Sequence, residues 1–193
     1  FVGMVGKDSF ATIVKEGLTS RNVSTEYLIE TDKAATGATI CMSYDQDRAN
    51  LTYQGTMAIM RLQDINPEVF KESKHIHLSS VFMQQALMKD LDKILEIALE
   101  NDCTTSLDTQ WDPIEKCDFD YKRILPLVTI FMPNETELKF LTGKKNLEEA
   151  VDEVLPYLRC TMVVKCGSKG SLMIRRNNER IMLPAFINNK VVD

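Results

Sequence analysis

The chain has 193 residues, of which 44% are hydrophobic and 26% are charged, and its formal net charge is −5. This balance is typical of one soluble globular domain, and the length suffices for a sizeable core. Acidic and basic residues are interspersed, which argues against nucleic acid or an anionic membrane surface as a partner. The sequence holds no apolar run near the roughly 20 residues of a membrane-spanning helix.

The cysteines indicate a compartment. Five of them are scattered along the chain: Cys41, Cys103, Cys117, Cys160 and Cys166. An odd number of cysteines without a CxxC pair favours a reducing environment over a disulfide framework. We therefore expect a cytoplasmic protein.

The first 55 residues predict a strand, a helix and a β-hairpin. A strand-like apolar run opens the chain, and Asp8 follows it as a candidate N-cap. The helix after Asp8 has an apolar face formed by Phe10, Ile13, Val14 and Leu18. Within Thr36–Gly55, two β-rich runs flank a polar turn at Asp45–Asn50, which indicates a hairpin. We expect this hairpin to stand off the core as a small β element.

Predicted strands and helices alternate from Lys74 to Cys166. The strands are 74–80, 104–108, 128–132 and 161–166, and the helices are 84–101, 135–141 and 147–158. A second hairpin follows at 171–183. The alternation implies right-handed βαβ units and a parallel sheet with helices on both faces. The predicted fold is α/β, with a three-layer α/β/α, Rossmann-like core at 1–33 and 58–193 and a β-hairpin at 34–57.

Asn134 and Glu137 form an N-x-x-E pattern where a predicted strand feeds a helix, directly after Pro133. Open α/β sheets bind their ligands at such strand ends. The pattern fits a capping box, in which Asn134 caps the helix and Glu137 reaches back to its amide. The same geometry also suits phosphate, which the helix amides attract, with Glu137 orienting water on Mg2+. The spacing alone leaves both interpretations open.

Gly167 and Gly170 follow the strand that ends near Cys166. Glycine allows a close approach of backbone to a ligand, but it also forms ordinary tight turns at the start of a hairpin. Neither a Walker loop nor a GxGxxG pattern occurs in the chain.

Three further polar residues lie on predicted strands. His75 and His77 share one face of a strand, but no further metal ligand is spaced to join them, so a structural role is favoured. Asp108 ends its strand and could hold a ligand or cap a turn.

Several stretches, taken in order, resemble the PfkB, or ribokinase-like, carbohydrate kinase family over essentially the whole chain. GMVGKDSFATIV is similar to its early glycine-rich segment, and the hairpin is similar to its β lid. HIHLSS, SLDTQW, MPNETELKFLTG and VVKCGSKGSLM resemble its H-L-S-G, D-x-N, N-x-x-E and T-L-G-x-x-G motifs. The final VVD resembles the opening of its V-V-D-T-x-G-A-G-D motif.

The resemblance implies an enzyme that uses ATP and Mg2+ to phosphorylate a hydroxyl group of a sugar. It implies nucleotide-binding roles for Asn134, Glu137, Lys165, Gly167 and Gly170, with Glu137 also holding Mg2+ through water. It implies acceptor-binding roles for Thr39, Cys41, Tyr53 and Ser79. Asp193 would ligate a monovalent cation such as K+. The lid would cover the acceptor and join two subunits into a homodimer, with a lid that folds only over its own subunit as the alternative.

The departures from the family pattern bear on activity. The Gly-Asp motif that supplies the catalytic base would lie beyond Asp193, so no catalytic residue is expected within this chain. The first strand of the family is also missing, and we expect a fragment that is inactive alone. Lys165 replaces the usual Thr, which puts its phosphate contact in doubt. Asp112 replaces an Arg, which weakens the case for an acidic sugar, and Ser80 replaces a Gly without clear consequence.

Two alternatives remain open at this stage. The chain could belong to a kinase of nucleosides or vitamin precursors with the same fold, since the acceptor is not identified by these residues. It could also come from a regulatory protein that binds a nucleotide or sugar without catalysis, because fold alone does not establish chemistry.

Overall fold

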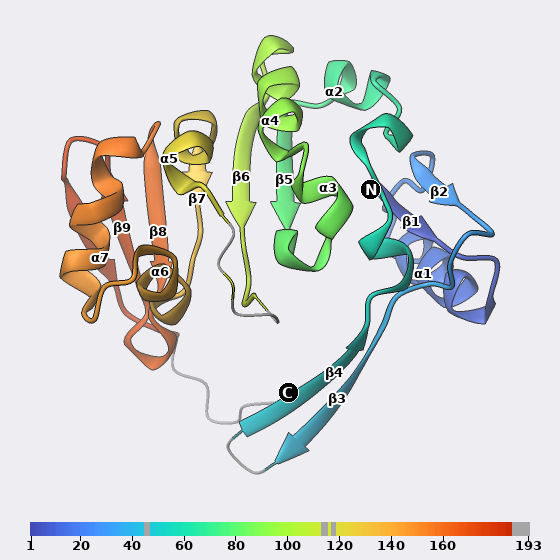
Figure 1. Cartoon of the computed structure of the whole chain (residues 1–193), viewed down its shortest axis with the longest axis horizontal. Coiled ribbons are helices and arrows are strands. Elements are labelled where there is room, and N and C mark those ends of the chain that lie inside the picture. Colours follow the sequence, from blue (N-terminus) through green and yellow to red (C-terminus); the bar gives the residue numbers. More distant parts are fainter. Residues whose placement is uncertain (45–46, 113–115, 117–118, 187–193) are drawn as a thin grey trace. The chain divides into compact units, whose positions relative to one another are not determined.

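A computed structural model describes residues 1–44, 47–112, 116 and 119–186 (Figure 1). The described residues form two compact units. Unit 1 contains residues 1–69 and 83–90, and unit 2 contains residues 70–82 and 91–186. These units divide the chain at other positions than the predicted core and lid, and that division stays a prediction. No described helix has the length and apolar character needed to cross a membrane.

Unit 1 is built around a short parallel strand pair and one longer helix. β1 (Gly3–Val5) pairs with β2 (Leu28–Glu30), and α1 (Ser9–Thr19) lies between them in the chain. Asp8 caps α1 as predicted, because its carboxylate accepts a hydrogen bond from the Ala11 N–H at 2.9 Å. The shorter helices of unit 1 are η1 (Gly55–Ala58), η2 (Leu62–Asp64) and α3 (Gln85–Met88), and α2 (Glu68–Glu72) begins at its boundary.

A two-stranded antiparallel ribbon, hereafter the ribbon, confirms the predicted hairpin. It consists of β3 (Ala38–Tyr44) and β4 (Asp47–Tyr53), paired from Ala38↔Tyr53 to Tyr44↔Asp47. The predicted polar turn was too long, because β4 already begins at Asp47. Asp and Asn favour turns locally, but here the cross-strand ladder outweighs that preference.

The base of the ribbon is fixed by hydrogen bonds to the cap of α1. The Thr36 N–H and hydroxyl donate to the two carboxylate oxygens of Asp8, at 2.7 and 2.8 Å, and the Gly6 N–H donates to the Thr36 hydroxyl at 2.8 Å. The pKa of Asp8 is lowered, first by the hydrogen bond from the Thr36 N–H and next by that from the Ala11 N–H. At the other strand, Gly55 has a φ of 52°, and a Cβ there would overlap the carbonyl oxygen of Ala35. The base of the ribbon is therefore held by hydrogen bonds to Asp8 and by the close approach of Gly55 to Ala35.

Unit 2 contains a six-stranded sheet in the order β10-β9-β8-β7-β6-β5. Four neighbouring strands are parallel: β5 (His75–Ser79), β6 (Thr104–Asp108), β7 (Ile130–Phe131) and β8 (Thr161–Lys165). The hairpin of β9 (Ser171–Arg175) and β10 (Arg180–Leu183) extends the sheet in the antiparallel sense. The predicted α/β class with a mainly parallel sheet is thus confirmed.

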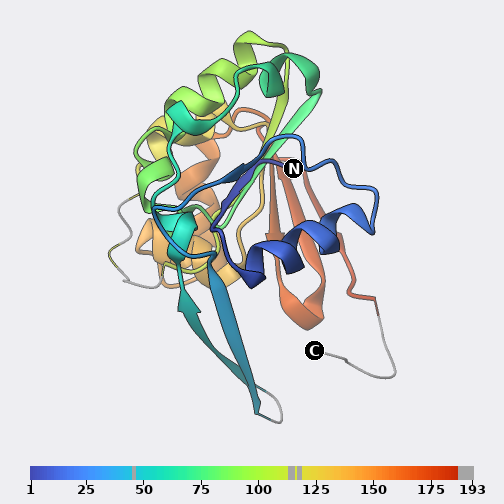
Figure 2. The ribbon, with the colours of Figure 1, turned by 90° about the vertical axis from the view of Figure 1, so that its right-hand side faces the viewer.

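The helices of unit 2 lie on one face of this sheet (Figures 1 and 2). They are α4 (Leu91–Glu100), α5 (Tyr121–Ile124), α6 (Glu135–Thr142) and α7 (Leu147–Val154), with the short 3-10 helices η4 (Leu125–Leu127) and η5 (Leu155–Tyr157). Fully buried side chains from both layers form the core, among them Leu95, Leu107, Phe131, Leu138, Val151, Met162 and Ile174. Burial of such apolar surface is the main term that holds strands and helices together.

The predicted helix 84–101 was wrong as a single element. The structure has α3 and α4 instead, with a break at Lys89–Asp90, and the two helices belong to different units. The apolar residues are nevertheless spaced as in one helix, and Leu87 and Leu91 are both buried. Hydrophobic periodicity therefore could not reveal the break. Asp90 directly precedes α4, a position that Asp commonly occupies at helix N-termini.

Two other elements are shorter than predicted. The strand expected at 128–132 is reduced to Ile130–Phe131, because Leu125–Leu127 already forms a 3-10 helix and Pro133 follows. The helix expected at 147–158 ends as an α-helix at Val154, where Pro156 cannot supply the next backbone donor.

Candidate functional site

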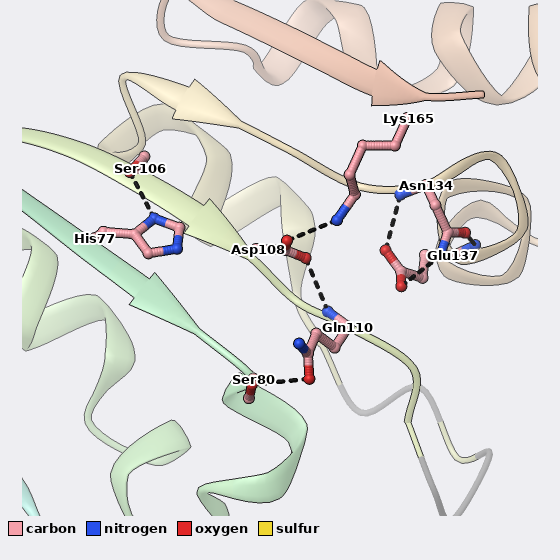
Figure 3. Close-up of polar contacts among 8 residues, drawn as sticks. All are labelled: His77, Ser80, Ser106, Asp108, Gln110, Asn134, Glu137 and Lys165. Atoms are coloured by element: carbon pink, nitrogen blue, oxygen red, sulfur yellow. Dashed lines mark hydrogen bonds and ion pairs between the residues drawn. The ribbon is translucent and has the colours of Figure 1, made fainter. Parts of the chain in front are cut away.

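The carboxyl ends of the four parallel strands bring polar side chains to one edge of unit 2. Asp108 ends β6, Lys165 ends β8, and Asn134 follows β7 (Figure 3). Asn134 and Lys165 are joined by a parallel bridge, and Ser79 at the end of β5 is the cross-strand partner of Asp108. The edge at the carboxyl ends of strands is the usual ligand site of open α/β sheets.

Asn134 and Glu137 form the predicted capping box. The Glu137 N–H donates to the Asn134 side-chain oxygen at 2.8 Å, and the Asn134 N–H donates to Glu137 Oε2 at 2.8 Å. The Asn134 side-chain amide also donates to Glu137 Oε1, at 2.6 Å. Gly143, with a φ of 68°, ends the same helix. The helix therefore begins and ends at the residues that the sequence indicated.

Glu137 is a buried acid, with a relative exposure of 6%. Burial raises its pKa above the ordinary value and outweighs the opposing effects of the Asn134 N–H and the Lys165 charge, while the charge of Asp108 raises the pKa further. A carboxylate has about four acceptor positions, and Asn134 uses two of them. The remaining positions can accept hydrogen bonds from water bound to a metal ion.

These residues fit Mg2+ held through water and phosphate. Mg2+ usually keeps several waters and takes one or two carboxylates together with substrate phosphates as ligands. Glu137 offers one carboxylate with open acceptor positions at the start of an eight-residue helix, whose free amides favour phosphate. Within the described ranges, no group of three or more His, Cys, Asp and Glu residues is placed to hold a metal directly.

Lys165 forms an ion pair with Asp108 across the end of β7. Its Nζ lies 2.6 Å from Asp108 Oδ2, while its backbone N–H donates to the Pro133 carbonyl at 2.9 Å. The two side chains are 45% and 21% exposed, and such accessible pairs contribute only about 0–1 kcal/mol to stability. The ammonium group can therefore leave Asp108 at little cost, although its backbone is fixed.

The two predicted glycines have different structural roles. Gly167, with a φ of 57°, begins η6 (Gly167–Lys169) and faces open space. Gly170, with a φ of 100°, lies against the chain leaving β10, where a Cβ would overlap the carbonyl oxygen of Leu183. A glycine is thus required at Gly170 by the protein itself, whereas Gly167 leaves its backbone accessible.

A strained turn beside Asp108 was not predicted from the sequence. Ser80 and Gln110 both have a positive φ, 56° and 59°, and the Ser80 hydroxyl donates to Gln110 Oε1 at 2.8 Å (Figure 3). Between Asp108 and Gln110, the buried Thr109 hydroxyl has no hydrogen-bond partner among the described residues. Non-glycine residues in this conformation cluster at functional sites. The replacement of a family glycine by Ser80 was the available signal.

The predicted acceptor residues lie on β3, β4 and β5. Thr39, Cys41 and Tyr53 lie on the ribbon in unit 1, and Ser79 lies in unit 2. The ribbon register places Tyr53 opposite Ala38, whereas Thr39 pairs with Thr52 and Cys41 with Asn50. Directly opposite side chains share a face, so Tyr53 lies on the face opposite to Thr39 and Cys41. One face of the ribbon therefore presents Thr39 and Cys41 without Tyr53, and the acceptor-binding roles of all three residues stay predictions.

The remaining candidates have protein partners or lie outside the described residues. His75 and His77 each hydrogen-bond the Ser106 hydroxyl at 2.7 Å, a structural arrangement of the predicted kind. Asp112 is buried and accepts a hydrogen bond from the Lys116 N–H at 3.0 Å. Asp193 lies outside the described residues.

Comparisons with known proteins identify the family of the chain. The model of the pfkB family carbohydrate kinases matches residues 1–193. An uncharacterized sugar kinase of Archaeoglobus fulgidus is 26% identical over 193 residues, which are 100% of this chain and 75% of that protein. The resemblance drawn from the motifs is therefore confirmed.

Two solved structures have the same fold. Ribokinase of Arabidopsis thaliana, complexed with ribose and ATP, has a TM-score of 0.81 at 22% identity. The match covers 100% of this chain and 63% of the ribokinase. Adenosine kinase of Sinorhizobium meliloti has a TM-score of 0.85 at 18% identity, with 99% of this chain covering 59% of it. The chain thus spans less than two thirds of either solved protein, and the likeness to them concerns the fold.

Proposed function

Because the chain belongs to the pfkB family of carbohydrate kinases, we propose that the complete protein transfers a phosphoryl group from ATP to a hydroxyl group of a sugar. The observation that carries the proposal is the grouping of Asn134, Glu137 and Lys165 at the carboxyl edge of the sheet. Amides, one buried acid and one exposed cation are the groups that a metal–polyphosphate needs from a protein.

Each group has a distinct role in this proposal. The amides at the start of α6 bind phosphate oxygens, and Glu137 orients water on the Mg2+ that neutralises phosphate charge. Lys165 and the open backbone at Gly167 border the polyphosphate, while Gly170 shapes the turn. Phosphoryl transfer depends mainly on positioning and on neutralising charge, which are the tasks these groups perform. We assign no general base among the described residues.

The decisive experiment compares two glutamates in the first turn of α6. Glu137→Gln removes the proposed metal-orienting carboxylate, and Glu135→Gln removes the charge of a neighbour that pairs with Lys139 at 3.1 Å. We expect Glu137→Gln to lower kcat about 10- to 100-fold and to raise the Mg2+ concentration required, as for other residues that orient metal ligands. Glu135→Gln should leave both quantities near the wild-type values. A Glu137→Gln protein with wild-type kcat and lower stability would reduce Glu137 to a capping role.

A nucleoside or vitamin-precursor acceptor is the second candidate, and the shared fold with an adenosine kinase favours it over unrelated alcohols. ADP release measured against a panel of sugars and nucleosides distinguishes the two. ATP binding without ADP release for any acceptor would instead support a regulatory protein that binds nucleotide without catalysis.

We further propose that the ribbon joins two subunits. Its Ile40, Met42, Leu51 and Tyr53 side chains share one face and are exposed. An isolated two-stranded ribbon is marginally stable in water, and a self-complementary contact across a two-fold axis would bury this apolar face. Sedimentation should show a dimer for wild type and a monomer for Met42→Asp, while Asn50→Asp on the polar face keeps the dimer. A monomeric wild type would contradict the proposal.

The polar face of the ribbon is proposed to contact the acceptor through Thr39 and Cys41, and Ser79 on β5 is proposed separately as an acceptor-binding residue. Thr39 already shares a hydroxyl contact of 2.9 Å with Thr52, which places two hydroxyl groups on that face. A cytoplasmic location and a monovalent cation such as K+ near Asp193 remain parts of the proposal that rest on the cysteine pattern and the family resemblance.

A further inference from the structure

Lys165 forms an ion pair with Asp108. The family resemblance leads us to expect a threonine at this position. The ammonium group crosses the end of β7 to reach the carboxylate at the end of β6 (Figure 3). A threonine hydroxyl cannot supply this charge, and its shorter side chain cannot span this distance. The ion pair is therefore a feature of this chain at the centre of its candidate site.

We propose that Lys165 exchanges partners: Asp108 holds its ammonium group in the free protein, and the polyphosphate takes it over when nucleotide binds. Asp108 then competes with the nucleotide for the same cation and thereby sets the affinity. The inference rests on the proposed function only in taking a nucleoside triphosphate as the ligand.

The charges at this edge make such an exchange favourable. Two carboxylates, Asp108 and Glu137, lie close enough to Lys165 and to each other for the three charges to interact. A polyphosphate approaching this edge therefore meets two carboxylates and one ammonium group, and its negative charge attracts the ammonium group of Lys165 away from Asp108. Hydrogen bonds from a cation to phosphate are among the stronger ones in proteins, whereas the exposed Asp108 pair is weak.

The geometry allows the side chain to move without the backbone. The Lys165 N–H is fixed to the Pro133 carbonyl, and its bridge to Asn134 places the lysine stem beside the start of α6. A lysine side chain has four methylene carbons joined by rotatable bonds, so its ammonium group can turn from one oxygen to another. Asp108 keeps a hydrogen bond from the Gln110 N–H to Oδ1, at 3.3 Å, when its Oδ2 loses Lys165.

A simpler role would be neutralisation, in which Lys165 only cancels the repulsion of Asp108 and never contacts phosphate. Both roles predict weaker nucleotide binding when Lys165 is lost. They differ when Asp108 is lost as well. Neutralisation predicts that removing both charges restores wild-type affinity, and partner exchange predicts that the double variant stays as weak as the lysine variant.

The test measures binding of a non-hydrolysable ATP analogue with Mg2+ to the complete protein by calorimetry. We expect Lys165→Met to weaken binding about 10-fold, which corresponds to about 1.4 kcal/mol, and Asp108→Asn to tighten it about 3- to 10-fold. The double variant should remain within about twofold of Lys165→Met. Lys144→Met, which removes a lysine paired to Glu153 at 3.2 Å, serves as the matched control with unchanged affinity. Thermal melting confirms that each variant is folded, and Lys165→Arg should retain most of the affinity.

Each outcome decides the inference. Wild-type affinity in the double variant, or in Lys165→Met, overturns it even if the protein is an active kinase. The expected pattern in a protein that releases no ADP supports partner exchange and refutes the kinase proposal. A wild-type protein that does not bind the analogue overturns both.

Discussion

The ribbon and the six-stranded sheet are both β structure, but they are stabilised in opposite ways. Leu51 on the ribbon is 62% exposed, whereas Leu107 on β6 is 0% exposed. The ribbon has a complete ladder of seven cross-strand pairs and a hydrogen-bonded base at Asp8 and Thr36, yet one of its faces is apolar and open. The sheet is held by burial against helices. Candidate ligand residues on the sheet are therefore positioned by a packed core, and those on the ribbon depend on what covers it.

The most direct way to break this comparison is to truncate one leucine in each region. Leu107→Ala should lower the free energy of unfolding by about 2–5 kcal/mol, because it removes fully buried atoms and leaves a cavity. Leu51→Ala should change it by less than about 0.5 kcal/mol in the dissociated subunit, because its side chain is little buried within its own chain. Urea unfolding of both variants measures the difference.

A large loss in Leu51→Ala would show that the ribbon is covered. If that loss grows with protein concentration, the cover is a second subunit, since association stabilises the folded state by mass action. A loss independent of concentration would instead mean that the ribbon packs within its own chain. Only the second outcome would withdraw the contrast between the two regions.

Much of the sheet unit could be predicted from the sequence because its signals are local. Pro133, the Asn134 cap and Gly143 mark the limits of α6 within ten residues of one another, and the structure confirms all three. Apolar, β-branched runs likewise predicted β5, β6 and β8. The break between α3 and α4 could not be predicted, because the apolar spacing of one helix continues through it.

The residues of the candidate site could be named from the sequence, but the contacts between them could not. The Lys165–Asp108 pair joins residues 57 positions apart, which become neighbours only after the strand order is set. The face of Tyr53 depends on the ribbon register, and a one-residue slip moves every side chain to the other face. Positive φ at Ser80 and Gln110 carried no local sequence signal apart from one replaced glycine.

A second comparison separates two glycines at the end of β8. Gly170→Ala should lower the free energy of unfolding by about 2–3 kcal/mol or more, because its conformation (φ 100°, ψ −134°) is nearly confined to glycine and its Cβ would overlap Leu183. Gly167→Ala should lower the free energy of unfolding by only about 1–2 kcal/mol. Its Cβ would face open space, so the positive φ is the only source of strain. Thermal melting ranks the two. Equal losses would mean that the turn shifts to accommodate a Cβ at Gly170.

The smallest expected effect tests whether burial controls the charge of Glu137. Its pKa is raised in the folded protein, so the folded state keeps this proton at pH values where the unfolded chain has already lost it. The folded state then binds more protons than the unfolded state, and stability falls as pH rises from about 4.3, the ordinary value for glutamate, through the raised folded pKa. Glu137→Gln has no proton to lose, so its stability relative to wild type should rise across that window and then stay constant.

Urea unfolding of both proteins between pH 4 and pH 8 measures this difference, with Glu135→Gln as a control that retains Glu137 and the wild-type slope. The opposite sign, a wild type that gains on Glu137→Gln as pH rises, would mean that the Asn134 hydrogen bonds and the Lys165 charge outweigh burial. Because Lys165→Met removes one of those two attractions, it should steepen the loss of stability with pH if burial dominates. If the Asn134 hydrogen bonds and the Lys165 charge dominate, the same substitution should reduce the gain of stability with pH. Glu137→Gln and Lys165→Met together therefore show whether burial or attraction determines the charge of Glu137.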